Sequence, residues 1–203
     1  KDDIFRIIAS TNSMPTEWQI IWRITLLTGL RQGEVLGFSW DAFNAKDKSI
    51  EVFQQLQRQT GKGLVIKDLK TDIAKRKLVL DVTTVNLLRK WRIEQTELKL
   101  ASKSWGCFDL IFTNSLGKPI EPRLMAKKWA SLLKLNQISH IKLHGARHSY
   151  ATMMIKNGMD INSVRHYLGH TDIRTTLSIY DHVTDKSLIA VAEKISNLES
   201  RGA

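Results

Sequence analysis

Between positions 144 and 180 the chain gathers side-chain types that suit chemistry on a phosphate ester. The stretch opens with HGARH at His144, continues through LGH at His170, and reaches Tyr180 ten residues later. An arginine fork matches phosphate oxygens, an imidazole exchanges protons near neutral pH, and a phenol with a pKa of about 10 is a nucleophile once deprotonated. His144 and Arg147 would share the first turn of a helix, where anions already bind well. These residues favour a phosphate site.

The same histidines allow a metal site as an alternative. His140, His144 and His148 are each four residues apart and would share one face of a helix, as zinc or manganese ligands could. Gly145 lies between two of them, and no cluster of Asp or Glu supplies the oxygen ligands of a hard-metal phosphodiesterase. We therefore expect no metal. Packing or capping accounts for His140, His166 and His182.

A second arginine with a nearby carboxylate lies far upstream, in the letters TGLRQGEVLGFSWD. Arg31 and Glu34 are one helical turn apart. Alone they would be a surface pair, worth about 0.2–0.5 kcal/mol. Together with Arg147, Arg31 would instead supply a second planar fork for the same phosphate.

The segment 49–81 changes to the two-residue period of strands. Residues 49–53 alternate polar and apolar side chains, Gly61 to Gly63 signal a turn, and 64–69 and 77–80 read as further strands of one small antiparallel sheet. The segment is rich in basic residues, which either form a charged, solvated edge or send one lysine into the site. They are Lys62, Lys67, Lys70, Lys75, Arg76 and Lys77.

The remaining segments read as helices that position these residues. We predict helices over 3–9, 18–27, 31–36, 81–101 and 121–135, followed by one that begins near His144 and a last one after Thr184. Residues 18–27 are apolar on nearly all sides, so that helix should be buried, and Gly29 suits its C-terminus. The inward faces of the helices at 81–101 and 121–135 should carry Val85, Leu88, Trp91 and Leu98, and Leu124, Trp129, Leu132 and Leu133.

Composition bounds the partner and the compartment. The 203 residues suffice for one domain, and 31 Lys and Arg against 20 Asp and Glu give a net charge of +11. Such a charge favours a polyanion, above all nucleic acid, as partner. The single Cys107 fits a reducing cytoplasm, and no apolar run is long enough to span a membrane. The chain starts at Lys1 rather than Met, so we expect a fragment that lacks an upstream part.

Taken together, TGLRQGEVLGFSWD, LKTD with RKLVL, HGARHSYAT and LGHTDIRTTLSIY resemble the motifs of the tyrosine recombinase (phage integrase) family. The resemblance runs from Thr28 to Tyr180. It departs from the family pattern at Ala146, where Leu is usual, and at Ser149, where Thr is common. The catalytic set that the resemblance implies is Arg31, Lys70, His144, Arg147, His170 and the nucleophile Tyr180, with Glu34 and His148 in support.

The resemblance also implies a fold, a mechanism and partners. The fold would be α+β and mainly helical, with one small three-stranded antiparallel sheet, and residues 1–203 would be a single catalytic domain whose N-terminal arm and core-binding domains are absent. Tyr180 would cleave double-stranded DNA through a 3′-phosphotyrosine, with Lys70 as general acid and with neither a metal nor ATP as cofactor. A homotetramer on DNA and the integration or excision of a phage or mobile element would follow.

Two other classes of function stay open at this point. A non-catalytic DNA-binding regulator would suit the basic charge but has no need of Arg31, Arg147 and Tyr180 together. A metal-dependent nuclease would need the ligands that the sequence lacks. Within the first class, a type IB topoisomerase uses similar residues, although the spacing from LGH to Tyr180 resembles an integrase more closely.

Overall fold

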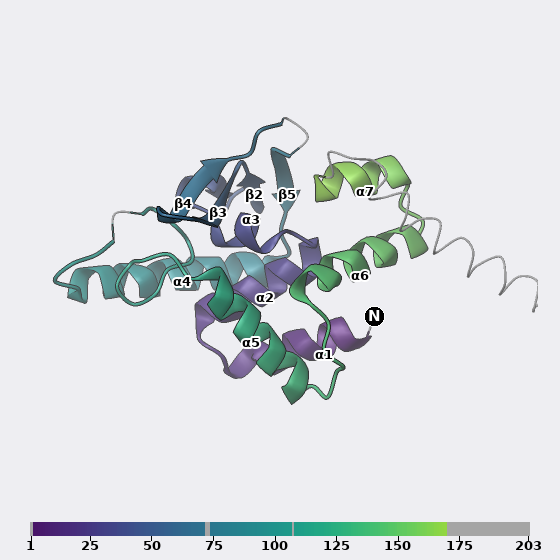
Figure 1. The fold of residues 1–203 in the computed structure, drawn as a ribbon, viewed down its shortest axis with the longest axis horizontal. Coiled ribbons are helices and arrows are strands. Elements are labelled where there is room, and N and C mark those ends of the chain that lie inside the picture. The colour runs from purple at the N-terminus through teal and green to yellow at the C-terminus, as the bar shows by residue number, and fades with distance from the viewer. Residues whose placement is uncertain (1, 72–73, 107, 170–203) are drawn as a thin grey trace, which may run out of the picture.

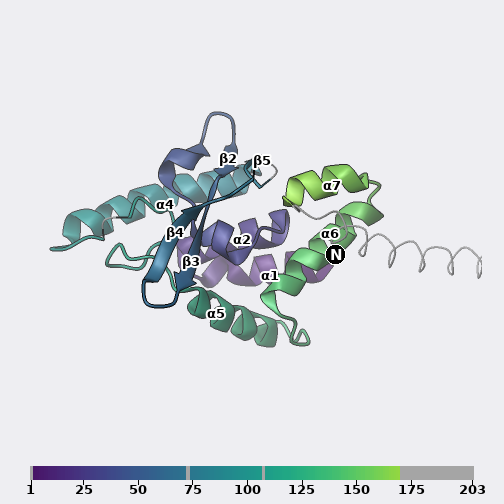
Figure 2. The ribbon, with the colours of Figure 1, turned by 45° about the horizontal axis from the view of Figure 1, so that its top comes forward.

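The computed structural model of the chain describes residues 2–71, 74–106 and 108–169 (Figure 1). His170, Tyr180, Cys107 and the predicted last helix lie outside the described residues. Within them, α2 (Thr16–Thr28) runs through the middle of the molecule. The helix α4 (Val82–Ala101) extends from the middle of the molecule to its left edge, and α7 (Ile161–Leu168) lies on the other side of the sheet (Figure 2).

Within the described residues, the helices predicted from periodicity are present with small shifts of their ends, whereas α7 is a helix that we did not predict. The others are α1 (Asp2–Ser10), α3 (Gln32–Leu36), α5 (Pro122–Leu135) and α6 (Leu143–Lys156), with short 3₁₀ turns η1 (Thr11–Ser13) and η2 (Trp40–Ala42). As predicted, Gly29 ends α2 in the left-handed conformation, with φ of 64°. No helix in the described part of the chain is long and apolar enough to cross a membrane.

The strands form two small sheets instead of the single sheet that we predicted. A three-stranded antiparallel sheet has the order β1 (Phe43–Asn44), β2 (Ser49–Val52) and β5 (Arg76–Val79). The strand predicted at 64–69, β4 (Gly63–Asp68), pairs instead with β3 (Gln54–Gln59) as a separate hairpin. We missed β3 because its sequence, QQLQRQ, is almost wholly polar and only Leu56 in it is buried.

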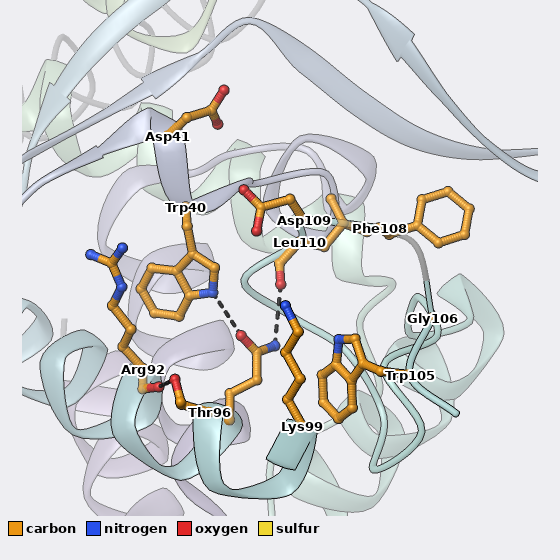
Figure 3. A pocket seen from close by; sticks show the side chains of 11 residues that line it. Trp40, Asp41, Arg92, Thr96, Lys99, Trp105, Gly106, Phe108, Asp109 and Leu110 are labelled. Atoms are coloured by element: carbon orange, nitrogen blue, oxygen red, sulfur yellow. Dashed lines mark hydrogen bonds between the residues drawn. The ribbon is translucent and has the colours of Figure 1, made fainter. Parts of the chain in front are cut away.

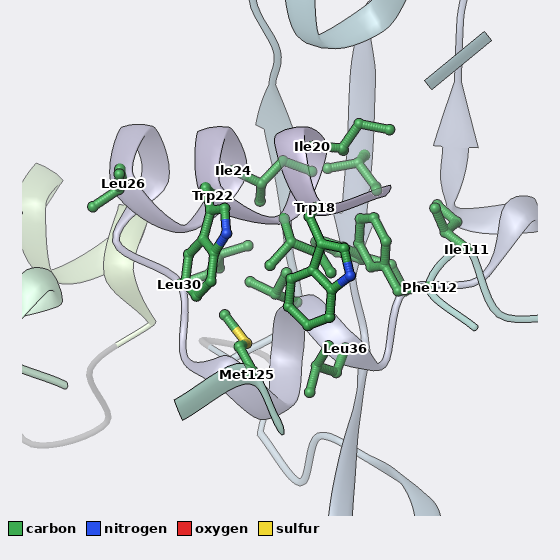
Figure 4. Close-up of a cluster of buried hydrophobic side chains, with 14 of the residues drawn as sticks. Trp18, Ile20, Trp22, Ile24, Leu26, Leu30, Leu36, Ile111, Phe112 and Met125 are labelled. Carbon is green, nitrogen blue, oxygen red and sulfur yellow. The ribbon is translucent and has the colours of Figure 1, made fainter. Parts of the chain in front are cut away.

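The core is built around the apolar α2, as its composition predicted (Figure 4). Trp22 is fully buried, and its ring centroid lies 6.0 Å from that of Trp18 and 5.6 Å from that of Trp129. Aromatic contacts of this kind add to the free energy gained from burial alone. A separate, smaller cluster joins α6 to α7 through Tyr150, Ala151, Ile155, Val164 and Leu168.

Two side chains assigned to the core lie at the surface. Leu124 is 42% exposed, and the neighbouring Met125 fills the buried position on α5. Leu98 is 36% exposed because the last turns of α4 extend beyond Gln95, the last buried residue of that helix. Both errors concern the end of an apolar stripe, where one position on a helix turns a side chain by about 100°.

Close packing fixes α3, and with it Arg31 and Glu34, against the hairpin. A Cβ atom on Gly33 would lie 2.7 Å from the Leu56 carbonyl oxygen. We expect Gly33→Ala to lower the free energy of unfolding by about 1–3 kcal/mol, because a backbone group must move. Urea unfolding followed by circular dichroism measures the change.

Gly145→Ala is the matched control for that prediction. It also adds one methyl group to a helical glycine, but the nearest atom, Cβ of Ile141, lies 3.9 Å away. Alanine should stabilise α6 there by about 0.5–1 kcal/mol. Equal unfolding midpoints for Gly33→Ala and the unsubstituted chain would contradict the packing argument.

Candidate active site

Glu34 is the buried centre of the candidate site. Its side chain is 0% exposed and accepts three hydrogen bonds, from the Arg31 backbone N–H at 3.0 Å, from Arg31 Nη1 at 2.9 Å and from Arg76 Nη2 at 3.0 Å. Burial raises the pKa of the Glu34 carboxyl, but the charge of Arg76 and the bonds from Arg31 outweigh it and hold this pKa below its usual value of 4.5. Glu34 is therefore an ionised, buried anchor.

Arg31 precedes α3 and points part of its fork away from that anchor. Its side chain is 40% exposed and contacts Glu34 through Nη1. Nε and Nη2 make no hydrogen bond within the described part of the chain. The rest of the planar fork is thus available for the oxygens of an anionic ligand.

Arg147 is buried and ties two helix ends together. From α6 it donates Nη1 to the Gly29 carbonyl at 2.8 Å and Nη2 to the Leu168 carbonyl at 2.7 Å. Burial and then the charge of Arg31 lower the pKa of Arg147 to about 9, so its guanidinium is still protonated at neutral pH. Sequence reasoning gave Arg147 the same task as Arg31, whereas the structure makes it the inner and more constrained of the two cations.

His144 lies in the first turn of α6, as predicted, close to both arginines. It is largely exposed, yet partial burial and then the charges of Arg147, Arg31 and His148 lower its pKa below the usual 6.5. An imidazole with such a pKa is mostly neutral at pH 7 and can donate or accept one proton. The structure therefore brings Arg31, Arg147, His144 and Glu34 into one electrostatic neighbourhood, with the exposed His148 at its edge.

The pKa of His144 provides a test of this neighbourhood. We expect nuclear magnetic resonance titration of the imidazole to give a pKa below 6.5, and a higher value in Arg31→Gln, because removing a nearby positive charge makes protonation easier. Arg123→Gln, which removes an exposed charge on α5, should leave the titration unchanged. Equal pKa values in the three proteins would show that Arg31 and His144 are not neighbours.

Lys70 is not brought into contact with these residues. It is exposed at a bend after β4 and makes no ion pair or hydrogen bond among the described residues. Positions 72 and 73, which follow Thr71, lie outside the described residues, as do His170 and Tyr180. The roles assigned to Lys70, His170 and Tyr180 remain predictions.

Arg76 belongs to the site, and the sequence reading missed it. The sequence suggests only one more basic residue of the segment 62–77, whose members form a solvated edge or send one lysine into the site, but the Arg76 side chain is 2% exposed and bonds Glu34. The available signal was the strand predicted from Lys77, in which an outward Lys77 and an inward Leu78 would turn Arg76 inward. The burial in β5 follows this order, since Arg76 and Leu78 are buried and Lys77 and Val79 are exposed. In a strand, residues two apart share a face, so Arg76 points inward with Leu78.

Neither a metal cluster nor the cleft beside α4 provides an alternative site in the described part of the chain. In the described ranges, no three His, Cys, Asp or Glu side chains gather as a metal ion would require. A cleft of about 640 Å³ lies beside α4 (Figure 3). There Trp40 Nε1 donates to Gln95 at 2.6 Å, and the Arg92 guanidinium lies over the Trp40 ring. None of the predicted site residues lines this cleft.

Comparisons with known proteins agree on one family. The sequence profile of the phage integrase family matches residues 1–187. A tyrosine recombinase XerC-like protein of Caldanaerobacter subterraneus is 30% identical over 84% of this chain and 47% of its own length. The integrase of Staphylococcus phage L54a is 27% identical over 86% of this chain and 50% of its own.

A solved structure extends the likeness to the fold. The Tn1549 transposon integrase in complex with transposon right-end DNA superposes with a TM-score of 0.75 at 23% identity, over 95% of this chain and 64% of that one. At that identity the likeness concerns the fold. The chain spans about half the length of the curated relatives that it matches.

Proposed function

The chain belongs to the phage integrase family, and we propose on that basis that it is the catalytic domain of a site-specific DNA recombinase. Its activity would be the breaking and rejoining of double-stranded DNA through a tyrosine. Residues 1–203 would form this single domain.

One observation carries the proposal, namely that Arg31, His144 and Arg147 lie in one electrostatic neighbourhood beside the Arg31–Glu34 ion pair. Arg31 and Arg76 both bond the Glu34 carboxylate, and the charges of Arg31 and Arg76 also act on the buried Arg147, so the neighbourhood is cationic. Part of the Arg31 fork is open to a ligand. A phosphodiester is the ligand that suits such an arrangement, because guanidinium forks bind its oxygens and stabilise the charge that builds up during cleavage.

The proposed reaction gives one role to each of the six residues in the predicted catalytic set. The Tyr180 oxygen attacks phosphorus and forms the P–O bond of a 3′-phosphotyrosine, and the phenolic proton passes to His170. The P–O5′ bond breaks, and Lys70 gives a proton to the leaving 5′ oxygen. Arg31 and Arg147 stabilise the transition state, and His144 donates to a phosphate oxygen. Attack by the 5′-hydroxyl of a partner strand reverses the step, so neither ATP nor a metal is needed.

The other two tyrosines support Tyr180 as the nucleophile. The Tyr150 and Tyr167 rings stack with centroids 6.1 Å apart, and burial raises the pKa of both phenols. A buried phenol that resists deprotonation is a poor nucleophile and has no room for a DNA strand. The chain holds three tyrosines in all, which leaves Tyr180.

The partners and the setting follow from the same proposal. Double-stranded DNA is the substrate, in line with the net charge of +11 and with the DNA in the structure of the Tn1549 integrase. We propose a homotetramer on DNA, in the cytoplasm of a bacterial or phage-infected cell. The named relatives include a phage integrase and the integrase of ICEBs1 in Bacillus subtilis, which favours integration and excision of a mobile element.

A covalent adduct formed in EDTA tests the proposal. The chain is incubated with a pool of nicked duplexes, labelled at the 5′ end and randomised around the nick, so that the short 5′-hydroxyl fragment diffuses away after cleavage. We expect an SDS-resistant labelled protein whose DNA-bearing peptide contains position 180. Cleavage that requires a divalent metal would indicate a nuclease, and DNA binding without any adduct would indicate a regulator.

A further inference from the structure

Arg76 is a buried cation at the first position of β5 with partners in three parts of the fold. Its Nε donates to the Tyr167 carbonyl at 2.7 Å, its Nη1 to the Ala74 carbonyl at 2.8 Å and its Nη2 to Glu34 at 3.0 Å. Gly169 makes room for it, since a Cβ atom there would lie 2.6 Å from Nη1. An arginine bonded through all three nitrogens is held in one position.

This position places Glu34 between two guanidinium groups. One oxygen of the carboxylate accepts from Arg31 Nη1, and the other accepts from Arg76 Nη2 and from the Arg31 backbone. Without Arg76 the buried carboxylate would face Arg31 as its one ion-pair partner, and the pair would be neutral. With Arg76 present, one negative charge is shared by two cations. Charges count for more in such a dry site than at the surface.

Resting on the proposed function, we propose that Arg76 is a positioning residue that acts through Glu34. It supplies the countercharge that lets Glu34 hold Arg31 in place without cancelling the positive charge that Arg31 presents to a phosphodiester. Arg76 itself touches no substrate, because its side chain is 2% exposed.

A double-mutant cycle tests this role by comparing Arg76→Met in two backgrounds. In the unsubstituted chain, Arg76→Met should slow adduct formation by about 10-fold to 10²-fold, because Arg31 is neutralised and less well fixed. In the Glu34→Gln background, where the carboxylate charge is gone, the same change should alter the rate by about 2-fold or less. A role in stability alone would slow both backgrounds equally, and that result overturns the proposal.

Arg76→Lys separates charge from shape and does not depend on the Glu34→Gln background being folded. Lysine keeps the positive charge beside Glu34 but has no fork to reach the Tyr167 and Ala74 carbonyls together. We expect it to recover most of the rate that Arg76→Met loses. Equal losses in Arg76→Lys and Arg76→Met would contradict a countercharge role. All variants are compared at a temperature where circular dichroism shows them folded.

Arg23→Met is the matched control. Arg23 also joins separate elements through a guanidinium, bonding Asp81 at 2.7 Å and Thr84 at 3.2 Å, but it lies outside the site. Its replacement should change the rate of adduct formation by about 2-fold or less. A loss as large as that of Arg76→Met would mean that the assay reports general destabilisation, and the proposal would fall.

Binding of inorganic phosphate gives a second readout that needs no cleavage. Phosphate is titrated into each variant and followed at the His144 imidazole resonances. We expect weaker binding in Arg76→Met, binding close to the original in Arg76→Lys, and no further loss when Arg76→Met is added to Glu34→Gln. If the unsubstituted chain forms no adduct, the proposed function fails, and this titration still decides whether Arg76 acts through Glu34.

Discussion

Tyr180→Phe is expected to form no covalent adduct with the nicked DNA pool, while it binds the same DNA as tightly as the unsubstituted chain. Phenylalanine keeps the aromatic ring and removes the oxygen that would become bonded to phosphorus. No other tyrosine can replace it, because burial raises the pKa of Tyr150 and of Tyr167. The loss should therefore be complete rather than partial, and gel electrophoresis in SDS with a parallel DNA-binding titration measures both quantities.

Tyr167→Phe is the control for this result. It removes a phenolic oxygen from a half-buried ring on α7 and should leave adduct formation intact. Arg31→Ala gives an intermediate case, because it removes one of the proposed transition-state donors and should slow adduct formation by about 10²–10³-fold. An adduct of normal yield in Tyr180→Phe would remove Tyr180 from the mechanism.

Glu34→Gln is expected to lower the free energy of unfolding by about 3–5 kcal/mol. The amide keeps the shape of the carboxylate but removes the negative charge between two guanidinium groups, of which Arg76 is buried. A buried charge without a partner is strongly destabilising, whereas a surface pair is worth little. Glu121→Gln is the matched control, because Glu121 pairs with Arg58 at the surface and its loss should cost about 0–1 kcal/mol.

The stability of the chain should also depend on pH through the ionisation of Glu34. The folded-state pKa of Glu34 lies below its usual value of 4.5. Its contribution to stability is therefore fully present above pH 4.5 and is lost as the pH falls below that value through the folded-state pKa. Urea unfolding at pH 7 and at successively lower pH should show a smaller loss of stability for Glu34→Gln than for the unsubstituted chain. Parallel curves would contradict the assigned ionisation.

The features that the sequence predicted well are those with a local cause. The run of apolar residues 18–27 predicted a buried helix, and Gly29 adopts the left-handed conformation that suits the end of that helix. The segments 49–53 and 77–80, which we predict as strands, correspond to β2 and β5 of the three-stranded sheet. Each of these depends on neighbours within a few positions, which the sequence displays directly.

The features that it missed depend on distant partners. Arg76 reads as one more basic residue until Glu34, 42 positions earlier, is seen to bond it. The strand β3 was hidden because its burial comes from α3 lying against it at Gly33 and not from its own polar letters. The sequence predicts Arg147 as a site residue. It does not predict the bonds of Arg147 to the Gly29 and Leu168 carbonyls, because every residue has a backbone carbonyl and only the fold brings these two close.

Because these hydrogen-bond partners are backbone carbonyls, the two arginines can keep them when the side chains at those positions are substituted. The backbone atoms at Ala74, Tyr167 and Leu168 that receive Arg76 and Arg147 exist whatever side chain stands there. Substitution at these positions alters packing but leaves the acceptors in place. Many of the surrounding residues can therefore change while Arg76 and Arg147 keep their carbonyl partners, provided that Gly29 and Gly169 keep the left-handed backbone conformation.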